Sequence, residues 1–227
     1  MRTLPEYTTM ELGRKLMRVI LTLAVVAGFA GASGCQAIKA ATTVPTTNMA
    51  EVANEAPAGV YRRDAPHTSL LFKLRHFAFS QFIGRLDKVD ATLIWDPVAP
   101  INSKLDVVID TASVDTNNRE IDQYVKSDRM FNAAKFPTAH FVSSKIVQTG
   151  KTTGDVLGDF TMNGQTHPVT LHVTFNGGAV NGLTDKPTLG FSATGIINRA
   201  DWGMGDLFPV LGHDVTLDIE IEFEKVK

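Results

Sequence analysis

Six histidines are the side chains of this sequence that most readily suggest a metal site. A zinc site needs several nitrogen, sulfur or oxygen ligands that converge on one point. His167 and His172 are an odd number of residues apart, so in one extended strand they point to opposite faces. The chain has a single cysteine, and the other four histidines form no closely spaced pair: His67, His76, His140 and His213. The spacing therefore predicts no metal centre.

Two further motifs could carry catalysis or cofactor binding, and both are incomplete. Residues 190–194 (GFSAT) lack the final glycine of a nucleophile elbow and lie in a strand-like stretch. Residues 203–208 (GMGDLF) begin like a dinucleotide-binding loop but end in phenylalanine and open no helix. Arg199 could pair with Asp201 and Asp214 at the mouth of the fold, and a structural role for that pairing is favoured over catalysis. The sequence thus predicts a protein that is not an enzyme.

The strongest pattern in the chain is an alternation of apolar and polar residues. Residues 215–224 (VTLDIEIEFE) alternate without interruption. In a β-strand this places every second residue from Val215 to Phe223, all of them apolar, on one face and the acidic residues on the other. Turn residues separate similar segments. The predicted strands are 59–63, 69–77, 85–95, 103–111, 141–148, 155–162, 167–176, 189–197 and 215–224.

One helix is expected among these strands, over residues 117–125, where Asn117 and Glu120 have the spacing of a capping box. Eight or nine antiparallel strands with one amphipathic helix favour an all-β, closed antiparallel barrel, because closure removes exposed sheet edges. A two-sheet sandwich is the alternative. A barrel of this size either fills its interior with side chains or holds one ligand, and the sequence leaves both outcomes open.

The strand pattern also predicts which side chains point inward. Phe72, Leu74 and His76 share one face, as do Val107 with Ile109, Leu171 with Val173 and Phe175, and Phe191 with Ala193 and Ile197. Two groups of aromatic and other large apolar side chains lie near the presumed openings, where they form either a ligand entrance or a plug over the core: Phe77, Phe79 and Phe82, and Trp202, Met204, Leu207 and Phe208.

The N-terminal residues have the order of a secretory signal. A basic stretch from Arg14 to Arg18 precedes the apolar run 19–30, and small residues lead to Cys35. We interpret 1–35 as a signal peptide with a lipobox-like end and Cys35 as a lipidation site. Residues 36–58, rich in Ala, Thr and Pro, are expected to form a flexible tether before a domain at 59–227. This order predicts a periplasmic protein that is anchored to the outer membrane by Cys35; the alternative is ordinary signal cleavage, which would leave a soluble periplasmic protein.

The net charge of −2 and a pI near 6.3 provide no basic surface for nucleic acid, so no nucleic-acid partner is expected. The sequence leaves a homodimer open as the oligomeric state.

Four segments in the same order resemble the YceI-like family. They are 64–76 (DAPHTSLLFKLRH), 127–141 (SDRMFNAAKFPTAHF), 158–169 (GDFTMNGQTHPV), and the pair 198–204 (NRADWGM) with 211–217 (LGHDVTL). Phe136 and Trp202 depart from the family's usual Tyr and Phe at these positions. The resemblance implies an eight-stranded, lipocalin-like antiparallel barrel in the periplasm that holds a long apolar lipid such as a polyisoprenoid or a quinone.

The predicted function is therefore binding, sequestration or transport of an isoprenoid-type lipid, with no cofactor besides that lipid. The alternatives are a filled barrel with a structural or stress-response role, and a hydrolase or redox accessory that uses His76, Arg199 and Asp201. The expected polar groups at the mouth are His67, Arg199 and Asp201. The expected ligand contacts are Phe72, Leu74, His76, Phe82, Met162, Phe175, Phe191, Ile197, Trp202 and Phe208.

The lipid anchor can be tested by fractionating cells. Stable anchoring takes two acyl chains, which a diacylated Cys35 supplies. Cys35→Ala should therefore release the domain into the soluble periplasmic fraction, while the wild-type protein stays with the membranes. Recovery of both proteins in the soluble fraction would show that the anchor does not exist.

Overall fold

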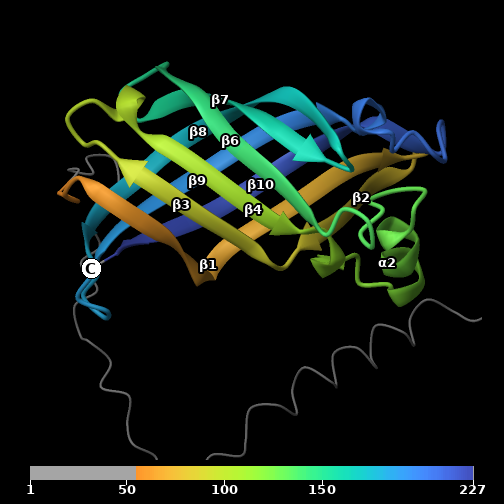
Figure 1. Ribbon diagram of the computed structural model, residues 1–227, viewed down its shortest axis with the longest axis horizontal. Helices are drawn as coiled ribbons and strands as arrows, with labels where there is room; N and C mark the ends of the chain where they lie inside the picture. Colours follow the sequence, from red (N-terminus) through yellow and green to blue (C-terminus); the bar gives the residue numbers. More distant parts are fainter. Residues whose placement is uncertain (1–54, 227) are drawn as a thin grey trace, which may run out of the picture. The chain divides into compact units, whose positions relative to one another are not determined.

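The computed structural model describes residues 55–226, which form a closed antiparallel β-barrel with one α-helix (Figure 1). No helix within this range is long and apolar enough to cross a membrane. The helix is α2 (Arg119–Lys126), and the 3₁₀ helices are η2 (Pro100–Asn102), η3 (Thr111–Ser113) and η4 (Arg199–Trp202). The strands are β1 (Gly59–His76), β2 (Ser80–Leu86), β3 (Val89–Trp95), β4 (Lys104–Asp110), β5 (Val114–Asp115), β6 (Thr138–Gln148), β7 (Thr153–Met162), β8 (Gln165–Val180), β9 (Pro187–Asn198) and β10 (Leu211–Lys225).

Ten strand segments make an eight-stranded wall. β2 and β3 follow one another along the same side of β1, and β5 continues the line of β4 beside them. The remaining strands pair with their neighbours in sequence, and β10 returns to pair with β1 along most of its length. This last pairing closes the sheet, which confirms the predicted barrel and excludes the sandwich.

The barrel has two distinct ends. At the helix end, the chain connects β1 to β2, β5 to β6 through α2, β7 to β8, and β9 to β10. At the loop end, it connects β3 to β4, β6 to β7, and β8 to β9. In Figure 1 the helix end lies on the right and the end of β10 lies on the left.

The predicted strands are present, with differences where the barrel bends. The two segments predicted at 59–63 and 69–77 form the single strand β1, whose register with β10 shifts between Arg63 and Thr68. The segment predicted at 85–95 is divided into β2 and β3. A closed wall must curve, and bulges and breaks of this kind allow strands to bend.

The predicted helix cap is wrong by one residue. Asn117 has a left-handed backbone with φ of 59°, and its N–H donates to the carboxylate of Asp115 at 2.8 Å. Asn118 caps the helix instead, because its side chain accepts hydrogen bonds from the N–H groups of Glu120 and Ile121.

The last residues of the predicted tether belong to the folded part of the chain. Glu55 N–H donates to the carbonyl of Gly178 at 3.0 Å, Ala56 is buried, and the Tyr61 hydroxyl donates to the carbonyl of Pro57. Residues 55–58, which the prediction assigned to the tether, therefore contact the barrel domain. The rest of that segment, the predicted signal peptide and Cys35 lie outside the described residues.

Close packing inside the wall depends on glycines. A Cβ atom on Gly158 would lie 2.5 Å from the ring of Phe141 and 2.5 Å from the carbonyl oxygen of Val142. The backbone oxygen cannot rotate away, so Gly158→Ala should strain the β6–β7 pair and lower the unfolding free energy by about 1–3 kcal/mol. Thermal melting measures this effect. Gly182→Ala is the control, because no atom lies within 4 Å of its added Cβ. Equal melting temperatures for the two variants would contradict this packing.

Candidate ligand-binding cavity

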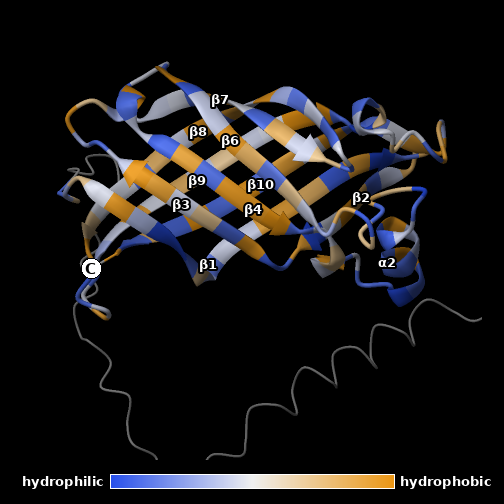
Figure 2. Ribbon diagram, in the orientation of Figure 1, coloured by the Kyte–Doolittle hydropathy of each residue, from blue (hydrophilic) through white to orange (hydrophobic). Residues whose placement is uncertain are grey.

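The interior of the barrel is not filled by side chains. A cavity of about 1000 Å³ extends from the helix end, where Tyr124 and Leu207 line it, to the loop end, where Val98 and Thr152 do. Inward residues of the strands form its wall, and almost all of them are apolar. Figure 2 shows the corresponding alternation of hydrophobic and hydrophilic residues along several strands. The cavity lies at the upper end of the usual size range of ligand pockets.

Most of the residues that the sequence assigned to the ligand line this cavity. They are Phe72, Leu74, His76, Phe82, Met162, Phe175, Phe191 and Ile197. The other inward residues predicted from strand alternation line it as well, from Val107 in β4 to Phe223 in β10. Their contact with a ligand stays a prediction.

An aromatic cluster forms the wall near the loop end. Trp95 stacks on Phe175 with 5.5 Å between ring centroids, and Phe191 lies edge-on to both Trp95 and Phe223 at 5.9 and 6.0 Å. Trp95 was missing from the predicted ligand contacts. The alternation of Val89, Ala91, Leu93 and Trp95 in β3 would have predicted that Trp95 points inward. In the structure all four side chains are buried.

Arg199 is the buried cation of the helix end. It is 2% exposed and lines the cavity, and its guanidinium donates to the carbonyl oxygens of Gly212 at 2.8 Å, Leu211 at 2.9 Å, and Met204. The predicted pairing with Asp201 and Asp214 is wrong, because main-chain carbonyls take these donors. Burial lowers the pKa of the Arg199 guanidinium, and attraction to Tyr124 and Asp206 partly opposes this shift.

A second polar group joins α2 to the loop that follows η4. The Tyr124 hydroxyl donates to the carboxylate of Asp206, and Arg129 forms an ion pair with the same carboxylate at 2.8 Å. The hydrogen bond from Tyr124 is the main cause that holds the pKa of Asp206 below its usual range. No local sequence pattern could connect Tyr124 with Asp206, which is 82 residues away.

Two of the predicted ligand contacts do not line the cavity. Trp202 is 1% exposed and packs edge-on to Phe160 and His167, and its indole N–H donates to the carbonyl of Phe160 at 3.2 Å. Phe208 is largely exposed and lies over the ring of His213. Both lie in η4 or in the loop after it, where strand alternation no longer determines which way a side chain points.

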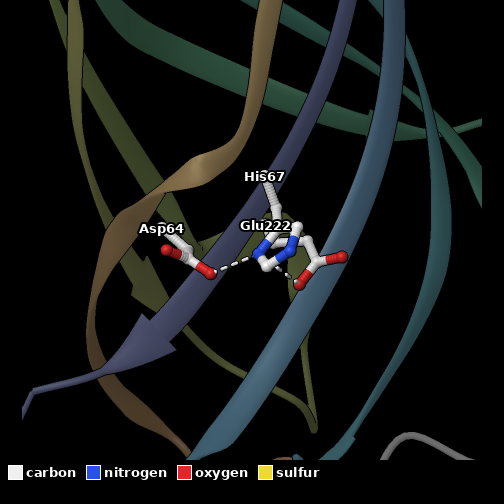
Figure 3. A group of neighbouring side chains, drawn as sticks. All are labelled: Asp64, His67 and Glu222. Carbon is white, nitrogen blue, oxygen red and sulfur yellow. Dashed lines mark hydrogen bonds and ion pairs between the residues drawn. The ribbon is translucent and has the colours of Figure 1, made fainter. Parts of the chain in front are cut away.

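His67 is not at the mouth but on the outer wall. Between Arg63 and Thr68, β1 has four residues that β10 does not match one for one, and this bulge carries Asp64 and His67 outside the wall. Figure 3 shows the imidazole between the carboxylates of Asp64 and Glu222, at 2.6 and 4.0 Å from its Nδ1 atom. The hydrogen bond to Asp64, followed by the charge of Glu222, raises the pKa of His67.

The three possible ligand atoms of Asp64, His67 and Glu222 lie within 4.8 Å of one another. The spacing argument against metal missed this group, because Glu222 comes from a neighbouring strand. Exposed histidine–aspartate pairs recur on the wall, at 2.9 Å in His140–Asp106 and at 2.8 Å in His172–Asp155. The group is thus one of several surface pairs, with one additional carboxylate.

The residues of the alternative enzyme do not form a catalytic set. Arg199 lines the cavity with each of its guanidinium nitrogens bonded to a carbonyl, whereas Asp201 is exposed and does not line the cavity. Ser192, in the incomplete nucleophile motif, donates to Glu220 at 2.7 Å and accepts from Asn176 at 2.8 Å. A nucleophile needs a general base within hydrogen-bond reach, and no histidine bonds this serine among residues 55–226.

Comparisons with known proteins agree with this architecture. The sequence profile of the YceI-like domain matches residues 61–223. A UPF0312 protein of Pseudomonas savastanoi pv. phaseolicola is 34% identical over 168 residues, which cover 74% of this chain and 85% of that protein. The crystal structure of the Campylobacter jejuni YCEI protein is similar with a TM-score of 0.61 and 29% identity, covering 67% of this chain and 90% of that one.

A third similar structure is a polyisoprenoid binding domain from Saccharophagus degradans, implicated in plant cell wall breakdown. It has a TM-score of 0.53 and 16% identity, and the match covers 75% of this chain and all of that one. At this level of identity the likeness concerns the fold.

The role of Arg199 can be tested by comparing two arginines of the helix end. Arg199→Met removes the donor of three main-chain carbonyls, and a buried carbonyl without a donor costs about 1–3 kcal/mol. Arg129→Met removes an ion pair whose arginine side chain is 62% exposed, so it should cost about 0–1 kcal/mol. Urea unfolding measures both. A smaller loss for Arg199→Met than for Arg129→Met would contradict the structural role.

Proposed function

This chain belongs to the YceI-like family, and we propose that it binds one long-chain apolar amphiphile of the isoprenoid type inside its barrel and does not transform it. The observation that carries the proposal is the continuous apolar cavity of about 1000 Å³. A barrel with a structural role alone would be expected to close-pack its interior, since protein interiors normally leave few voids larger than a water molecule.

The chemistry of the wall favours a hydrocarbon chain over a polar ligand. Each CH₂ group that is transferred from water to such a wall contributes about 0.8 kcal/mol, so a long chain offsets the entropy that is lost on binding. Chain length should therefore affect affinity more than the chemistry of the head group. The similar domain from Saccharophagus degradans, which is a polyisoprenoid binding domain, supports the choice of ligand class.

The polar lining of the helix end favours one orientation of the ligand. His76, Tyr124 and Arg199 line the cavity there and are buried or half-buried. Near the loop end the aromatic cluster surrounds the axis, and the polar side chains at that opening, Gln148, Lys151 and Thr152, are exposed to solvent. An amphiphile bound with its head group at the helix end and its tail toward the aromatic cluster would satisfy both surroundings.

The cellular setting is part of the same proposal. A secretory signal and a lipidated Cys35 would place the barrel in the periplasm, next to the membranes that contain isoprenoid lipids. In that setting the protein sequesters the lipid or carries it between membranes. The proposal includes no cofactor besides the bound lipid.

Blocking the cavity tests the proposal. Ala193 lines the cavity on β9, and Thr194 is the next residue and faces out of the barrel. Ala193→Trp should expel the lipid and leave the fold largely intact, because the indole enters the cavity and not a close-packed core. Thr194→Trp is the matched control and should keep the lipid. The measurement is lipid extraction and mass spectrometry of protein from its native host, together with thermal melting.

The structural alternative makes the opposite prediction. The binding function is excluded if wild-type protein from its native host contains no lipid and Ala193→Trp lowers the unfolding free energy by about 1–3 kcal/mol, as overpacking of a core does.

A further inference from the structure

Four large apolar side chains are exposed around the helix end of the barrel, and we name them the apolar rim. The exposed fraction is 86% for Phe79, 61% for Phe208, 47% for Phe77 and 41% for Leu207. They come from two neighbouring connections, the β1–β2 turn and the loop between η4 and β10. A cluster of exposed large apolar side chains on a soluble domain marks a contact with a ligand, another protein or a membrane.

The backbone of the rim is strained in a way that needs an explanation. Six non-glycine residues among those described have positive φ, and four of them are asparagine or aspartate, which tolerate the left-handed region. The other two are Phe77 at 49° and Leu207 at 63°, and both belong to the apolar rim. Bulky residues persist in this conformation only where the surrounding structure imposes it, and such positions cluster at functional sites.

The two connections hold each other in place. The N–H of Phe77 donates to the carbonyl of Val210 at 2.7 Å, and the N–H of Leu211 donates to the carbonyl of Leu207 at 2.9 Å. The rings of Phe77 and Phe79 lie 5.7 Å apart. The apolar rim is thus presented on an ordered support, and ordering its side chains costs less when they bind.

The apolar rim borders the cavity. Leu207 is exposed and also lines the cavity, and His76 and Val210, which adjoin the rim in sequence, line it too. Buried and half-buried polar groups that suit a head group, including Tyr124 and Arg199, lie at this same end.

The loop end has exposed apolar residues as well, but of another kind. Val98 and Ile101 are exposed on the β3–β4 connection, where they share the opening with the polar side chains of Gln148, Lys151 and Thr152, and Val180 and Leu183 are exposed at the β8–β9 connection. None of these four apolar residues is aromatic, and none has a left-handed backbone. The observations therefore favour the helix end.

We infer that the apolar rim docks onto the surface of a phospholipid bilayer and that the ligand passes between bilayer and cavity at this end. The passage of ligand rests on the proposed function, whereas the docking can be measured without any ligand. The aromatic side chains would enter the boundary between head groups and acyl chains, as apolar faces of interfacial proteins do.

Fluorescence quenching in the full-length chain tests which end meets the bilayer. Phe79→Trp places an indole on the apolar rim, and Val98→Trp places one at the loop end as the matched control. The probe is a vesicle of phosphatidylethanolamine and phosphatidylglycerol in which part of the acyl chains carries bromine. The indole at 79 should be quenched and that at 98 should not, after subtraction of the wild-type signal from the buried Trp95 and Trp202. An N-terminal anchor would affect both variants equally.

A double variant measures the contribution of the apolar rim. Phe79→Ser with Phe208→Ser should weaken vesicle binding, and slow lipid transfer into the cavity, by at least about tenfold for each phenylalanine. Val180→Ser with Leu183→Ser is the matched control, because both residues are exposed at the loop end and do not line the cavity; it should change neither quantity. Quenching at position 98 alone, or at neither position, would overturn the inference. Conversion of a dimer to a monomer by the double variant, without vesicle binding by the wild type, would assign the apolar rim to self-association instead.

These outcomes separate the inference from the proposed function. Bound lipid in the native protein without quenching at position 79 would remove the docking inference alone. Quenching at position 79 with no lipid in the native protein would support docking and remove the proposed function.

Discussion

Pairing of β1 with β10 is the constraint on which the rest of the molecule depends. It joins the first strand to the last, so every strand of the ring has two partners and one face turned inward. An eight-stranded ring has an interior just wide enough to be filled by side chains or to hold one small ligand. In this chain Phe72 lies directly over Gly84, its partner in β2, and Phe141 lies over Gly158 of β7. Each glycine lets a large ring lie along the wall instead of across the axis, and this arrangement leaves the cavity open.

The wall could be predicted from the sequence because its information is local. A period of two residues determines which face a side chain occupies, so the inward positions of Phe72, Leu74, Phe175 and Phe191 follow from alternation alone. The same rule would have found Trp95, whose strand alternates as clearly. The YceI-like resemblance added the number of strands and the class of ligand, and comparison with known proteins confirms the family.

The connections could not be predicted in this way. The position of His67 depends on a bulge that moves part of β1 outside the wall, and the position of Trp202 depends on a 3₁₀ turn. Asp206 was part of an incomplete motif in the sequence, yet in the structure it binds Tyr124 and Arg129 from a distant segment. These positions are determined by tertiary contacts between segments that no local pattern relates.

One guanidinium links the polar end of the cavity to the apolar rim. Arg199 donates to the carbonyls of Met204, Leu211 and Gly212, which flank Leu207 and Phe208 on both sides. Asp206 lies between these residues in the sequence, and its carboxylate accepts a hydrogen bond from Tyr124 of α2. This hydrogen bond is the main cause that lowers the pKa of Asp206. A carboxylate whose folded pKa lies below its unfolded value contributes stability that is present above the unfolded pKa and is lost as pH falls through the folded value. At neutral pH the loop is therefore fixed at its base by Arg199 and at its middle by Asp206. Because it is fixed at both points, its apolar side chains can face water without folding back into the cavity that they border.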